Sequence, residues 1–63
     1  MNDTYWTVKA MRLWGGSFVK ALAECVIAAD DENLEKIKRT WPKYWEKYFD
    51  LGQGLKEKDA KKP

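Results

Sequence analysis

The chain contains none of the cross-links that usually stabilise a very small domain. It has 63 residues, and Cys25 is its only cysteine, so a disulfide within the chain is excluded. Histidine is absent, which removes a common ligand of structural zinc sites. A domain of this length buries only about 60% of the surface that its unfolded chain exposes. We therefore expect one domain that depends on side-chain packing and on self-association.

Residues 18–29 form the clearest predicted helix. Lys20 and Glu24, spaced i,i+4, mark its solvent-exposed side. The rest of its circumference is apolar, and a helix of this kind must be covered on more than one side. We therefore predict a homo-oligomer. The predicted subunit interface comprises Phe18, Leu22 and Val26.

Glycines separate this helix from an earlier one, which we expect over residues 4–14. Gly15 and Gly16 together cost a helix interior roughly 2 kcal/mol relative to alanines. We predict a break or a sharp kink there, with Ser17 as the N-cap of the second helix. Cys25 lies on an apolar face and is expected to be a buried small hydrophobe.

A third helical segment is expected from about residue 34 to residue 51. Asp30 or Asp31 would cap its start. Pro42 interrupts the segment, which either bends there or stops near Thr40 and restarts with the proline in its first turn. The apolar positions keep their alternating spacing of three and four across Pro42, which favours a bend, and Gly52 is placed to end the helix. These positions are Leu34, Ile37, Trp41, Tyr44, Tyr48 and Leu51.

The net charge of +2 comes from the last residues of the chain. Residues 1–55 are formally neutral, whereas the remainder contains four lysines and two acidic residues. With Leu55 as its one large apolar side chain, the segment 55–63 is expected to be a disordered basic tail, and residues 1–54 the helical domain. A neutral helical domain with a short basic tail is weak evidence for nucleic-acid binding, because such binding needs several contacts between basic side chains and phosphates.

No catalytic, cofactor-binding or metal-binding residues are predicted. Cys25 has no histidine to activate it as a nucleophile. The acidic run 30–32 lacks the ligand spacing of a calcium loop, and the segment 15–17 lacks the lysine and spacing of a phosphate-binding loop. We therefore expect a protein that is not an enzyme.

The segment 41–49 is the most distinctive, with five aromatic residues in nine. Three interpretations stay open: a core with an oligomer interface, a docking surface for another protein, and a nucleic-acid stacking surface. Acidic residues interleave with the lysines of this region, which disfavours the third. The predicted interaction residues lie outside the row of apolar positions spaced three and four apart. They are Trp45, Lys43, Lys47 and Phe49.

Three short motifs resemble those of short, uncharacterised proteins from bacteriophages and prophage regions. They are the run 15–19 (Gly-Gly-Ser-Phe-Val), the turn from Ala29 and Asp30 to Asn33, and the run 41–48, with Trp-Pro followed by Tyr-Trp and Tyr. The resemblance covers about residues 10–50. It implies a phage or mobile-element source, and it implies no activity and no functional residues.

The sequence as a whole predicts an all-α protein, with two or three helices in a hairpin-like unit completed by homo-oligomerisation. We expect a non-enzymatic interaction or accessory protein that binds a protein partner, with a nucleic-acid-binding module as the alternative. No signal peptide or membrane-spanning run is recognisable, so a cytoplasmic protein without a membrane partner is expected.

Overall fold

The computed structural model describes residues 3–61, and the regular structure in this part of the chain is entirely helical. The predicted all-α class is therefore confirmed. The described region holds four helices rather than two or three. They are α1 (Asp3–Trp14), α2 (Ser17–Ala28), α3 (Asp31–Thr40) and α4 (Pro42–Ala60).

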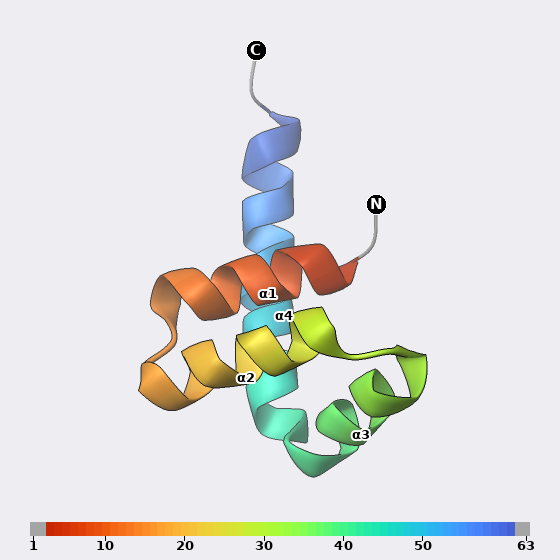
Figure 1. The fold of residues 1–63 in the computed structure, drawn as a ribbon. Helices are drawn as coiled ribbons and strands as arrows, with labels where there is room; N and C mark the ends of the chain where they lie inside the picture. The colour runs from red at the N-terminus through yellow and green to blue at the C-terminus, as the bar shows by residue number, and fades with distance from the viewer. Residues whose placement is uncertain (1–2, 62–63) are drawn as a thin grey trace.

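Helices α1 and α2 form a hairpin, and α4 lies across it. Figure 1 shows α1 and α2 side by side in front of α4, whose C-terminal turns extend beyond α1. Helix α3 lies to one side, below α2 in this view, and packs against α4. The hairpin therefore has one face covered by α4.

The predicted break between the first two helices is confirmed. Gly15 is buried, and a Cβ atom there would collide with the side chain of Val19 and lie 2.5 Å from the carbonyl oxygen of Met11. The tight connection of the hairpin therefore requires glycine at this position. The predicted N-cap is wrong, because Gly16 is the N-cap of α2 and Ser17 is already its first helical residue.

Pro42 ends one helix and begins another. Helix α3 stops at Thr40, Trp41 has φ −127° and ψ 61°, and Pro42 occupies the first turn of α4. The favoured prediction of a bend is wrong, and the alternative that the sequence left open is correct. The physical reason is that proline disfavours helical geometry in the preceding residue but suits the first helical position.

The start of α3 agrees with the prediction of an aspartate cap. A carboxylate oxygen of Asp30 accepts a hydrogen bond of 2.8 Å from the backbone N–H of Asn33. The acidic residues Asp31 and Glu32 follow in the first turn, where the helix dipole favours negative charge.

Helix α4 continues well past its predicted end. Gly52 lies within the helix, which runs to Ala60, so the predicted stop at Gly52 and the predicted disorder of residues 55–60 are wrong. Leu55 is half-buried against the core and gives these turns an apolar anchor. No break in the helix coincides with the expected domain boundary at residue 54. Residues 62–63 of the expected tail lie outside the described residues.

Gly52 is the point where α4 touches the backbone of α1. A Cβ atom at Gly52 would lie 2.6 Å from the carbonyl oxygen of Trp6 and 2.9 Å from the backbone nitrogen of Thr7. The facing residues of α1 are small, and Thr7 and Ala10 are both 0% exposed. The two helices therefore approach more closely here than any side chain on α4 would allow.

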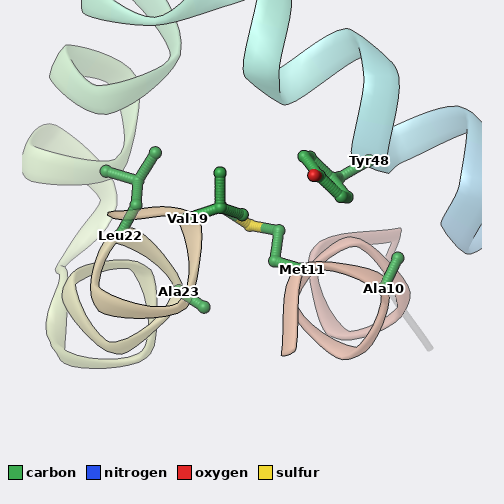
Figure 2. Packing of buried hydrophobic residues seen from close by; sticks show 6 residues of the cluster. All are labelled: Ala10, Met11, Val19, Leu22, Ala23 and Tyr48. Carbon is green, nitrogen blue, oxygen red and sulfur yellow. The ribbon is translucent and has the colours of Figure 1, made fainter. Parts of the chain in front are cut away.

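The core fills the space between the hairpin and α4. Met11 from α1 and Val19 from α2 point towards each other beneath the ring of Tyr48 from α4 (Figure 2). Tyr48 is 4% exposed, so one aromatic ring of α4 covers the seam between the two helices of the hairpin. Ala10, Leu22 and Ala23 complete the cluster.

Polar contacts join the start of α1 to the later turns of α4. The Lys56 ammonium lies 3.4 Å from a carboxylate oxygen of Asp3, and both side chains are nearly half exposed. The neighbouring side-chain amide of Gln53, and then the Lys56 ammonium, hold the pKa of Asp3 below its ordinary value. Nε2 of Gln53 is buried and has no hydrogen-bond partner among the described residues. We therefore attribute its lowering of the Asp3 pKa to the dipole of the nearby amide rather than to a hydrogen bond. Exposed contacts of this kind add little to stability.

The close contact at Gly52 predicts opposite effects of alanine at two glycines of the same helix. Alanine is normally better than glycine inside a helix by about 1 kcal/mol. Gly54 has open space around it, so Gly54→Ala should raise the free energy of unfolding. Gly52→Ala should lower it by about 1–3 kcal/mol, because backbone atoms obstruct the new methyl group. Urea denaturation followed by circular dichroism measures both, and equal stabilisation by the two variants would contradict the crossing.

Candidate functional site

Three of the four residues predicted to bind a partner are half-buried or contact other residues of this chain. Trp45 and Phe49 are half-buried, and the Lys38 ammonium lies 5.2 Å from the centroid of the Trp45 ring. The Lys47 ammonium lies 5.4 Å from the ring centroid of Tyr48, and Lys43 is exposed. These four residues therefore do not form a freely exposed aromatic and basic surface.

The helical spacing predicts one aromatic face made by Trp41, Tyr44 and Tyr48, and this face packs against the core only in part. Tyr48 is buried and Trp41 is half-buried, which agrees with this spacing, but Tyr44 is 41% exposed. Phe18 at the start of α2 contacts the rings of Trp41 and Tyr44, with centroid separations of 5.8 and 5.6 Å. These contacts tie the start of α2 to the start of α4.

The predicted subunit interface does not form one exposed face. Leu22 and Val26 are 6% and 4% exposed, because the packing of the hairpin already covers them within one chain. Phe18 is 52% exposed, but it lies with the aromatic residues at the start of α4. Cys25 is exposed, so its expected burial is also wrong.

A groove between α1 and α2 gathers exposed apolar side chains. It has a volume of about 580 Å³, and residues of α1 and α2 alone line it. Its lining comprises Thr4, Tyr5, Val8, Lys9, Arg12, Leu13, Val26 and Ile27. Leu13 and Ile27 are 55% and 54% exposed, so the groove opens to solvent with large apolar groups at its rim.

Helix periodicity explains why the groove lies away from α4. Successive residues of a helix are about 100° apart, so Val8 projects roughly 200° from Ala10. Ala10 belongs to the core cluster with Tyr48 of α4, whereas Val8 is only half-buried: it packs against the edge of that cluster and also lines the groove. The hairpin therefore has two apolar faces, and among the described residues α4 occupies one of them.

Positive charge flanks the groove. The Lys9 ammonium lies 5.9 Å from the ring centroid of Tyr5 and 5.5 Å from that of Trp6, which holds the cation beside the lining. Arg12 approaches Glu24 on α2, with 3.8 Å between the guanidinium Nε and a carboxylate oxygen. Both of these side chains are largely exposed, so the pair is weak.

The chemistry that this groove offers is apolar contact with positive charge at its edge. Its lining contains no carboxylate and no thiol. Within residues 3–61, no group of three or more His, Cys, Asp or Glu side chains could hold a metal ion. Over the same range, no helix is both long enough and apolar enough to cross a membrane.

Sequence reasoning did not identify the groove, although part of the signal was present. The apolar circumference of α2 predicted that more than one of its sides needs a cover, and Ile27 is among the residues of that circumference that stay exposed. In α1, two apolar stripes coexist, one through Trp6 and Ala10 and another through Tyr5 and Val8. A single helix with two stripes indicates two packing partners.

Comparison with known proteins identifies no relative. No protein-family model, no curated protein and no solved structure matches this chain.

The half-buried position of Trp45 predicts an intermediate cost of its removal. Tyr48→Ala should cost about 3–5 kcal/mol, as for other buried aromatic residues. Trp45→Ala should cost clearly less, with about 0.5–1 kcal/mol of that loss from the Lys38 contact. Urea denaturation of both variants and of Lys38→Met measures these differences. If Trp45→Ala unfolds at the same urea concentration as the unsubstituted chain, Trp45 contributes nothing to the fold and returns as a candidate partner anchor.

Proposed function

We propose that this chain is a non-enzymatic interaction protein that docks a helix of a partner protein into the groove between α1 and α2. The observation that supports this proposal is the exposure of Leu13 and Ile27 at the rim of an apolar groove on the uncovered face of the hairpin. Apolar side chains that gather in this way mark interaction sites more often than single exposed ones do.

The shape of the groove suits a helix better than a small molecule. The two helices of the hairpin have 12 residues each, which corresponds to a length of about 18 Å. An amphipathic helix inserts its apolar face into a groove of this kind. A small-molecule site encloses most of its ligand, whereas the rim residues Leu13 and Ile27 are more than half exposed.

Nucleic-acid binding, the alternative that the sequence left open, has less support. Stacking of bases needs aromatic rings presented next to free cations. Trp45 is half-buried, and Lys38 and Lys47 already lie over rings of this chain. Glu46 and Asp50 interleave with the lysines of α4, which weakens the attraction of this helix for phosphates.

The proposal predicts that one charged substitution in the groove abolishes partner binding without unfolding the chain. Leu13→Glu introduces a carboxylate at an exposed position of the rim, so the fold should persist while docking is lost. Leu51→Glu is the matched control, because Leu51 is also exposed but belongs to α4.

The measurement is quantitative capture of proteins from the source cells by the unsubstituted chain and by both variants, with circular dichroism to confirm folding. The expected result is a protein retained by the unsubstituted chain and by Leu51→Glu, and lost with Leu13→Glu. If every captured protein is retained equally by the two variants, the groove is not the docking surface.

A further inference from the structure

We propose that the groove selects an amphipathic helix of about three turns that carries carboxylates beside its apolar face. This inference rests on the proposed function and adds the chemical class of the partner. Its basis is the charge of the groove: the lining includes Lys9 and Arg12 and no acidic residue.

The one nearby carboxylate does not cancel this charge. Glu24 lies 3.8 Å from Arg12, but both side chains are more than half exposed, so solvent screens the pair. The Lys9 ammonium contacts the rings of Tyr5 and Trp6. A carboxylate from a docked helix would approach Lys9 at the edge of the groove, where exclusion of water strengthens the attraction.

A second copy of this chain fits the groove less well. A two-fold dimer brings the same patch of both subunits together. Two patches that each carry Lys9 and Arg12 would then face each other, and Glu24, the carboxylate beside Arg12, offsets only part of their positive charge. Like charges across an interface disfavour the pairing, whereas carboxylates on a foreign helix favour it.

The spacing of the lining sets the length of the expected helix. The lining positions of α1 run from Thr4 to Leu13, which corresponds to about 14 Å along the helix axis. A helix that follows this groove presents apolar anchors at positions i, i+3 or i+4, and i+7. Its carboxylates would flank these anchors on the side of Lys9 and Arg12.

A displayed peptide library tests this charge selection. Each peptide is a helix of about 14 residues with leucine fixed at i, i+4 and i+7, and with Glu or Lys at random in the flanking positions. The library is selected on the immobilised full chain, and binders that also bind Leu13→Ser, which removes the apolar rim residue without adding charge, are removed. Enrichment of Glu at the flanking positions is expected. Enrichment of Lys, no preference, or no groove-dependent binder overturns the inference.

Binding of an enriched peptide, made synthetically, checks which cations select it. Lys9→Gln combined with Arg12→Gln should weaken binding about tenfold, and so should about 0.5 M salt. Lys20→Gln, a substitution of an exposed lysine outside the groove lining, is the matched control and should leave binding unchanged. If Lys20→Gln weakens binding as much as the combined Lys9→Gln and Arg12→Gln substitution does, the inference is overturned.

The outcomes separate this inference from the proposed function. Binders that depend on Leu13 but carry lysines leave the groove as the docking surface and overturn only its acidic preference. If sedimentation shows a dimer of the unsubstituted chain that Leu13→Glu dissociates and Leu51→Glu does not, a second copy occupies the groove. That result also overturns the acidic helix as the occupant.

Discussion

The close approach of α4 to α1 at Gly52 determines how the rest of the chain is arranged. With a Cβ at this position 2.6 Å from the carbonyl oxygen of Trp6, only glycine lets the two backbones meet. Thr7 and Ala10 are fully buried around this contact, and Tyr48, one turn earlier on α4, covers the seam of the hairpin. The cost of a glycine within a helix is about 1 kcal/mol, which the packing of a small chain can offset. A chain without cross-links thus gains a core by bringing backbones, rather than long side chains, together.

This arrangement also leaves a face of the hairpin uncovered. Helix α4 lies across one side of α1 and α2, and α3 packs against α4 (Figure 1). Neither α3 nor α4 contributes a residue to the lining of the groove. Helix α2 is the most apolar of the four by sequence, yet Ile27 remains more than half exposed. The same crossing that builds the core therefore creates the surface to which we assign partner binding. Lys9 and Arg12 give that surface its charge.

Local signals in the sequence predicted local structure, while packing decided the rest. The break at Gly15 and Gly16 and the cap at Asp30 depend on a few neighbouring residues, so they could be predicted. Gly52 was read as a helix end because the helix that crosses it comes from the other end of the chain, and no local pattern records that contact. Leu22 and Val26 were assigned to a subunit interface for the same reason, since the residues that bury them belong to a fold not yet known. The groove was missed because its two walls come from separate helices.

Nuclear Overhauser effects at Gly52 test the central claim most directly. In the uniformly labelled full chain, the α protons of Gly52 should show cross-peaks to backbone protons of Trp6 and Thr7, because the two backbones are in contact. The α protons of Gly54, with open space around them, should show none to α1. If neither glycine shows cross-peaks to α1 although the chemical shifts show a helical chain, the crossing of α4 over α1 is contradicted. The uncovered face of the hairpin, which follows from that crossing, is then contradicted as well.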